Sequence, residues 1–484
     1  MIKLEKFTRY CLIGLTSLAL LMMIFIFSTE SGNVNPFVVI ITMIPLYFIL
    51  RFINGLLRKS SKRQLRNIVI GSVLAVTILA ILNVIFFRVQ LFGDVQICID
   101  MARKISQNNF EWSNWILQYK NLVPLTILYS WMMKIGQFLH TGFYPIFFAY
   151  NISLLIGSLV LTLLTLWHKK PQSAALAGLL AIVLPVFYSF IIQVGYTDGA
   201  SILALSLLIF LFEYNHLNWW KLILLTFVFA YGYLMRPNII IALVALFIIG
   251  LFTYKKQNNI FKLVSKLFIF CSLGIILATS TSKIFDATYH YNVNNPKQFP
   301  VVHWIYMGLN QEKIGQYNKA DRSYTLNHEG FSSAQNADIA GIKNRLLNYR
   351  PLTLGLHFIS KYGILWHEGT FQTLTDYQKN YIFAPKLFLK YSKLIFLVSQ
   401  VFSKALISLF LFFLVLELLR KKPIPRNSIL LSLLIIFGIS LFHTIIWEVK
   451  TRYQFMTFFL LFFVGVYAMV EYFEKDNFWK FISF

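Results

Sequence analysis

Long apolar runs separated by short basic loops constrain this chain more than any other feature. Of its 484 residues, 57% are hydrophobic and only 13% are charged, whereas soluble domains average about 25% charged residues. Runs near 20 residues are long enough to cross a bilayer as helices. They lack the two-residue alternation of membrane barrels, so we expect an all-α polytopic membrane protein.

About twelve segments are predicted to span the membrane, starting from a cytoplasmic N-terminus. They are residues 10–28, 36–54, 68–88, 142–166, 174–193, 199–214, 219–235, 237–254, 267–285, 387–419, 428–447 and 454–473. The first is too long for the apolar region of a signal peptide, so we interpret it as a retained span. Segment 122–139 carries Lys134 and Gln137, and we expect it to be a helix at the outer interface.

The charges support this topology. The net charge is +25, and basic residues cluster in loops without acids: RKSSKRQLR (58–66), HKK (168–170), YKKQNNIFK (254–262) and RKKPIPR (420–426). This is the positive-inside pattern of cytoplasmic loops, and it favours anionic lipid headgroups over nucleic acid as the partner. The outer face then receives a first loop at 89–141 and segment 286–386, which has the composition of a soluble protein.

Two aspartates follow predicted spans on the outer face. Asp94 comes shortly after span 68–88; an Asp after Gly can cap a helix, and a carboxylate at a membrane surface can also be functional. Asp198, in VGYTDGAS, can likewise cap the next span or contact a substrate hydroxyl or the first loop. Asp100 has Arg103 at helical spacing, so we interpret it as a surface ion pair.

Two arginines are candidates for binding phosphate at the outer surface. Arg236 lies at a proline-broken turn between spans, and Arg452 lies in WEVKTRYQF. A planar guanidinium is well suited to hold a phosphate, and the alternative is contact with lipid headgroups. Lys450 is a weaker candidate, and Glu448 either joins the site or is the ion-pair partner of Arg452.

Segment 286–386 contributes His303 and Asp321, in HWIYMGLNQEKIGQYNKADR, as further polar candidates. The histidines and acids of this segment lack the spacing of a metal-binding helix, so we predict no metal site. A divalent cation is the one cofactor left open. No G-x-x-x-x-G-K-[ST] motif is present, which argues against nucleotide hydrolysis.

The order of these motifs resembles the GT-C superfamily of membrane glycosyltransferases. An outward Asp after an early span is followed by QYKNLVPLTIL, YTD and MRPN. More closely, the chain resembles the bacterial protein-mannosyltransferase-like (family 39-type) branch of Gram-positive bacteria, over roughly residues 68–470. Residues 1–67 would then be an additional hairpin before a GT-C-like module at 68–285, with C-terminal membrane helices at 387–484. The protein mannosyltransferases have an Asp-Glu pair at this place, whereas here Asp94 is followed by Val95.

The resemblance implies transfer of a sugar from a polyprenyl phosphate at the extracytoplasmic face of the cell membrane, with Asp94 as the catalytic carboxylate. Arg236 and Arg452 would hold the phosphate, while Asp198 and His303 would orient the sugar or the acceptor. The acceptor would be a cell-envelope glycopolymer, a lipid or a protein. Two alternatives stay open: a polysaccharide polymerase or ligase that uses a lipid-pyrophosphate donor, and a lipid or solute transporter.

Overall fold

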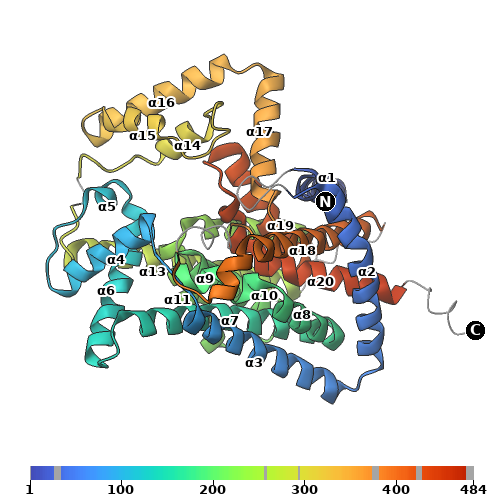
Figure 1. The fold of residues 1–484 in the computed structure, drawn as a ribbon. Helices are drawn as coiled ribbons and strands as arrows, with labels where there is room; N and C mark the ends of the chain where they lie inside the picture. Colours follow the sequence, from blue (N-terminus) through green and yellow to red (C-terminus); the bar gives the residue numbers. More distant parts are fainter. Residues whose placement is uncertain are drawn as a thin grey trace, which may run out of the picture.

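The computed structural model describes residues 2–26, 34–254, 259–292, 295–372, 381–420 and 428–475 (Figure 1). Within these ranges, eight helical segments are long and apolar enough to cross a membrane. They are α1 (Ile2–Phe25), α2 (Pro36–Lys59), α3 (Lys62–Phe86), α7 (Phe143–Lys169), α13 (Asn259–Thr288), α18 (Lys386–Leu419), the segment Ser428–Ile446 with α19 (Ser428–Leu441), and the segment Thr451–Lys475 with α20 (Phe458–Lys475). The chain is therefore an all-α membrane protein, as predicted.

The expected count of about twelve spans is not confirmed. Every predicted span coincides with helical structure, but four of them are short or bent. These are the bent pair α8 (Pro171–Val183) and α9 (Phe190–Val194), and the helices α10 (Asp198–Tyr214), α11 (Trp219–Met235) and α12 (Ile241–Thr253). In the described part of the chain the count is eight, or nine if the bent pair is one span.

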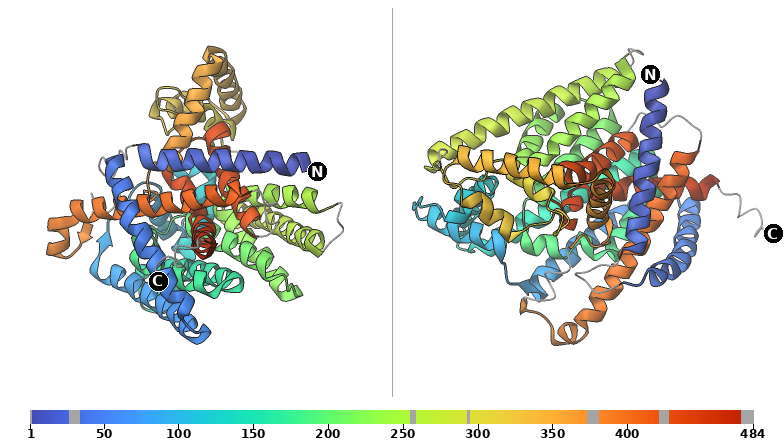
Figure 2. Two further views of the ribbon diagram at one scale, coloured as in Figure 1. Left: turned by 90° about the vertical axis from the view of Figure 1, so that its right-hand side faces the viewer. Right: turned by 90° about the horizontal axis from the view of Figure 1, so that it is seen from above.

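The C-terminal helices form the centre of the bundle, and the N-terminal helices lie at its edge. In α20, 89% of the apolar stretch is buried, compared with 17% in α3 and 22% in α2. α20 packs against α7, α8, α18 and α19 (Figure 2). A helix that is apolar on all sides needs protein or lipid around it, so the exposed apolar faces of α1 to α3 are available to the bilayer.

The polar stretches form two groups of shorter elements. The first loop contains β1 (Arg88–Val89), α4 (Gly93–Ser106), α5 (Asn114–Gln118) and α6 (Val123–Phe138), and the second group contains α14 (Val302–Gly308), α15 (Lys319–Leu326), α16 (Phe331–Asn348), α17 (Pro351–Trp366) and β2 (Tyr381–Phe383). Segment 122–139 is a helix that is not among the candidate spans and that packs against α4 and α7. β1 pairs antiparallel with β2 and joins the two groups.

In Figure 1, α14, α15 and α16 lie together on one side of the bundle, and α17 leads from them back to α19. We call residues 302–366 the outer segment.

One predicted basic cluster is engaged within the protein. Lys169 pairs with Glu213 at 2.9 Å, and Lys170 pairs with Glu471 and Glu474. These two lysines of HKK therefore join the end of α7 to the ends of α10 and α20. The predicted contact of this cluster with lipid headgroups is thus replaced by ion pairs within the protein. Most of RKKPIPR and the middle of YKKQNNIFK lie outside the described residues.

Candidate functional site

Two neighbouring cavities share the side chains of Tyr196 and Tyr453. The smaller has a volume of about 270 Å³, and the larger about 430 Å³. The polar residues of the smaller cavity include Asp94, Lys450 and Arg452. The larger cavity is lined by Arg236 and Glu448, by aromatic rings and by aliphatic side chains. The structure thus brings together charged residues from three distant parts of the chain: Asp94, Arg236, and the neighbouring Glu448, Lys450 and Arg452.

Asp94 lies in the first turn of α4, but it does not cap the helix. The N-cap position is Phe92, without a side-chain hydrogen bond, and Gly93 begins the helix at φ +57°. The carboxylate of Asp94 instead accepts hydrogen bonds from Trp115 Nε1 at 2.8 Å and from the Tyr196 hydroxyl at 3.1 Å. The capping interpretation is therefore wrong. Asp100 forms the predicted exposed ion pair with Arg103, at 3.5 Å.

Contacts between the first loop and residues 289–299 fix the position of Trp115. Trp112 Nε1 donates to the Tyr289 carbonyl at 2.9 Å, and Asn295 Nδ2 donates to the Leu117 carbonyl at 2.6 Å. On the other side, the guanidinium of Arg322 lies 4.8 Å from the Trp115 ring centroid. Trp115 of the first loop is therefore packed against Arg322 of the outer segment, with its N–H directed at Asp94.

A buried cluster of three charges separates the cavities. Asp198 is 4% exposed, and its carboxylate pairs with Arg236 and, at 3.5 Å, with Arg452. The guanidinium of Arg236 lies 5.4 Å from the Tyr453 ring, and that of Arg452 lies 4.4 Å from the Tyr196 ring. Asp198 is thus the ion-pair partner of both arginines. The two guanidinium groups lie one at each cavity, and one carboxylate pairs with both.

Glu448 and Lys450 line different cavities. Glu448 lines the larger cavity and accepts a hydrogen bond from the Tyr453 hydroxyl. Burial raises the pKa of Glu448 above its usual value. Arg452 pairs with Asp198, so the predicted ion pair between Glu448 and Arg452 is wrong. Lys450 is exposed at the smaller cavity, beside Asp94 and Arg452.

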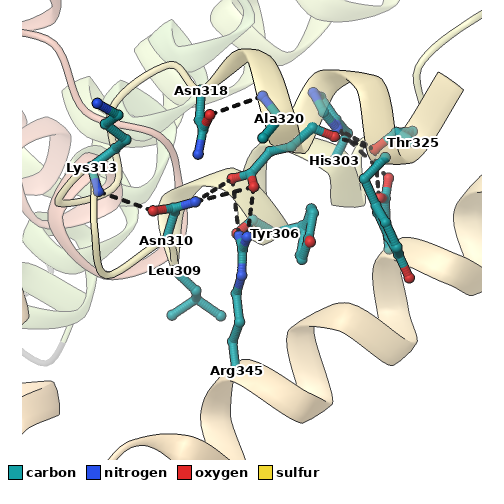
Figure 3. Close-up of polar contacts among 12 residues, drawn as sticks. His303, Tyr306, Leu309, Asn310, Lys313, Asn318, Ala320, Thr325 and Arg345 are labelled. Atoms are coloured by element: carbon teal, nitrogen blue, oxygen red, sulfur yellow. Dashed lines mark hydrogen bonds and ion pairs between the residues drawn. The ribbon is translucent and has the colours of Figure 1, made fainter.

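The structure places His303 and Asp321 in a separate buried network in the outer segment. Figure 3 shows this network, with His303, Asn310, Thr325 and Arg345 labelled. Asp321 accepts hydrogen bonds from Arg345, the shortest at 2.6 Å, and from Asn310 at 2.9 Å. His303 contacts Thr325 at 2.8 Å, and burial lowers its pKa to about 4, so the ring is neutral at pH 7. Neither residue lines the two cavities. His303 does stack on Phe299, a residue of the larger cavity, with ring centroids 4.4 Å apart.

The site also contains residues that the sequence did not single out. Tyr453 and His443 both line the larger cavity, and their rings stack at 4.5 Å. His443 Nδ1 lies 2.9 Å from the Glu448 carbonyl, and Asn238 Nδ2 lies 2.9 Å from His443 Nε2. Because the carbonyl can only accept, His443 carries its proton on Nδ1 and receives the Asn238 amide on Nε2. Among the described residues, no three His, Cys, Asp or Glu side chains gather where they could hold a metal ion.

These observations define a multi-pass membrane protein with a charged site beside its helical bundle. The chain belongs to a family described as conserved hypothetical integral membrane protein, and the match covers residues 10–378. No curated protein matches the chain.

Proposed function

We propose that the protein is a membrane glycosyltransferase that moves a sugar from a polyprenyl-phosphate donor to a cell-envelope acceptor at the extracytoplasmic face. One observation carries the proposal: the carboxylate of Asp94 shares a cavity with the guanidinium of Arg452, next to a larger cavity with a second arginine, Arg236. A base and fixed cations on two sides of one space are what glycosyl transfer from a lipid phosphate requires.

The charge balance of the cluster supports phosphate binding. Asp198 carries one negative charge, and Arg236 and Arg452 together carry two positive charges. Within this buried cluster one positive charge is therefore left over, while Asp94 and Lys450 face the smaller cavity and Glu448 faces the larger one. A buried charge is strongly favoured to find a partner, and guanidinium groups bind phosphate oxygens with good geometry.

The larger cavity supports a lipid donor. Its aliphatic wall includes Met235, Ile240, Ile241 and Val301, and its charged wall includes Arg236. An isoprenoid chain would lie along the aliphatic side, and its phosphate would lie beside Arg236 and the shared tyrosines. The sugar would then reach the smaller cavity, where Asp94 would contact the acceptor hydroxyl.

The proposed reaction is a direct displacement. The acceptor hydroxyl attacks the anomeric carbon and its proton passes to the Asp94 carboxylate, while a new bond forms between the acceptor oxygen and that carbon. The bond from the anomeric carbon to the phosphate oxygen breaks, and its electron pair stays on the leaving polyprenyl phosphate. Arg452, Arg236 and Lys450 stabilise the negative charge that grows on this phosphate. The hydrogen bonds from Trp115 and Tyr196 keep the carboxylate in one orientation.

The test is sugar transfer by the purified protein in nanodiscs, with radiolabelled polyprenyl-phosphate sugars as donors and an envelope extract as acceptor. Asp94→Asn should reduce transfer at least a thousandfold. Asp100→Asn is the matched control, because it removes the same charge from the same helix at an exposed ion pair. Equal activity of the two variants would reject Asp94 as the base.

The same nanodiscs distinguish the other two functions. Transfer only from a pyrophosphate-linked donor would indicate a polymerase or ligase. Movement of lipid or solute across the bilayer without a glycosylated product would indicate a transporter. Either result would overturn the proposal.

A further inference from the structure

Residues 447–452, which we call the site segment, line the cavities with four side chains, those of Trp447, Glu448, Lys450 and Arg452. The backbone is extended at Trp447 (φ −104°, ψ 171°) and at Lys450 (φ −150°, ψ 141°). In an extended chain, successive side chains point to opposite sides. Glu448 and Lys450 accordingly line the cavities on either side of Val449, and Arg452, in the 3₁₀ helix that begins at Thr451, lines the smaller cavity. Val449 and Thr451 are each 1% exposed.

The outer segment holds the site segment at every second residue. The Trp447 ring stacks on Trp304 of α14, with centroids 5.5 Å apart and planes 4° apart. The Val449 amide donates to the Gly315 carbonyl at 2.9 Å. The Thr451 hydroxyl donates to the Ile364 carbonyl of α17 at 2.7 Å. The buried residues Val449 and Thr451 are therefore attached to the outer segment by hydrogen bonds, and Trp447 is attached by a ring stack in the wall of the larger cavity.

Lys361 of α17 is at the centre of this attachment. Its side chain is fully buried, and Nζ donates to the Gly308 carbonyl at 2.9 Å and to the Trp447 carbonyl at 2.7 Å. The chain is tightly packed here: a methyl group on Gly308 would lie 2.6 Å from the Trp447 carbonyl oxygen. Lys361 therefore bridges the end of α14 and the start of the site segment.

No carboxylate makes a close ion pair with Lys361 in the described residues, which is unusual for a buried lysine. The charged and titratable groups that face it are Glu448 on the site segment, His443 before that segment, and His357 on its own helix. Burial lowers the pKa of Lys361 to about 7, and Glu448 opposes that shift. A buried charge is costly and is weak evidence for stability, whereas its two carbonyl contacts join α14 to the site segment.

We propose that Lys361 is a positioning residue: it sets the site segment, and through it the places of Glu448, Lys450 and Arg452 in the two cavities. The consequence for donor binding rests on the proposed function, whereas the consequence for the backbone does not.

The experiment uses a matched pair of variants, Lys361→Met and Lys404→Met. Lys404 is also fully buried, and its Nζ also bridges two carbonyls, those of Ile26 and His367, each at 2.9 Å, but it does not contact the site segment. Two quantities are measured on the full-length protein in nanodiscs: the affinity for farnesyl phosphate, and amide hydrogen exchange in the peptide that covers residues 447–453.

In Lys361→Met, we expect the affinity for farnesyl phosphate to fall at least tenfold and exchange at the Val449 amide to become at least tenfold faster. Lys404→Met should change neither quantity more than twofold. If Lys361→Met does not fold, Lys361→Gln takes its place; its shorter amide reaches one carbonyl, so both effects should keep their direction with smaller size.

The results separate the two proposals. Exchange in the site segment that is equal in the Lys361 and Lys404 variants overturns the positioning role. Failure of the unmodified protein to bind farnesyl phosphate overturns the donor class instead, and exchange alone then decides the role of Lys361.

Discussion

Removing the charge of Asp198 gives the sharpest test of the arginine cluster. Asp198→Asn keeps the shape of the side chain but leaves two guanidinium groups without their shared carboxylate. The side chains of Asp198, Arg236 and Arg452 are 5%, 8% and 18% exposed, so water in the two cavities replaces the lost carboxylate only in part. Breaking a buried ion pair in this way costs about 3–5 kcal/mol. The Arg452 contact is long, at 3.5 Å, and the new amide can still accept one hydrogen bond, so we expect the lower end, about 3 kcal/mol.

A lipid phosphate should repair this defect if the arginines hold phosphate. A ligand at 100 times its dissociation constant stabilises a protein by about 2.7 kcal/mol. In Asp198→Asn the phosphate supplies the missing negative charge as well, so it should bind more tightly and raise the Tm more than in the unmodified protein. The assay is the Tm from tryptophan fluorescence in detergent, with and without farnesyl phosphate. Farnesol, which has the same chain without the phosphate, is the control.

Two results would refute this reasoning. An unchanged Tm of Asp198→Asn without ligand would show that the cluster does not depend on the shared carboxylate. A ligand-induced rise in Tm that is the same in both proteins, or the same with farnesol, would show that the phosphate does not reach Arg236 and Arg452.

Two further predictions concern the backbone before Asp94 and the pH dependence of stability. Gly93→Ala should lower the free energy of unfolding by about 1–2 kcal/mol, because an alanine is strained at the positive φ of +57°, and it should reduce sugar transfer. The control is Gly355→Ala, at an exposed helical position with open space, which should be neutral or stabilising. An equal effect of the two substitutions on stability would contradict this reason. The pKa of Lys361 is lowered to about 7, so between pH 7 and about 10 the unfolded chain binds a proton that the folded protein does not, and stability rises with pH. The Tm of the unmodified protein should therefore rise relative to that of Lys361→Met across this window, and parallel Tm curves would show that the lysine does not titrate there.

Apolar runs predicted the helices but not how many of them span a membrane. The runs at 68–88 and 387–419 became α3 and α18, because a long apolar segment has few alternatives to a helix. The run at 174–193 became the bent pair α8 and α9, with Pro185 at the break. Composition gives the length of an apolar run, but a proline within the run can break it into two helices.

The candidate residues that could be found from the sequence are charges beside predicted spans. Asp94, Asp198, Arg236 and Arg452 satisfy that condition, and the structure groups them around Tyr196 and Tyr453. The hydrogen bonds from Trp115 and Tyr196 to Asp94 were not predictable. They depend on the first loop packing against residues 289–299, and nothing in the local sequence distinguishes those rings from other aromatic residues at a membrane surface.

Asp321 shows how a polar residue can matter to the site without lining it. Its carboxylate joins Arg345 of α16 to Asn310, just after α14, and Arg345 also donates to the Tyr306 carbonyl within α14. α14 ends at Gly308, whose carbonyl is held by Lys361 together with that of Trp447. A rigid path of hydrogen bonds therefore leads from the buried network to the backbone that carries Glu448. We infer that the outer segment is built around buried charges because it must hold an extended chain in place, which apolar packing alone would do less specifically.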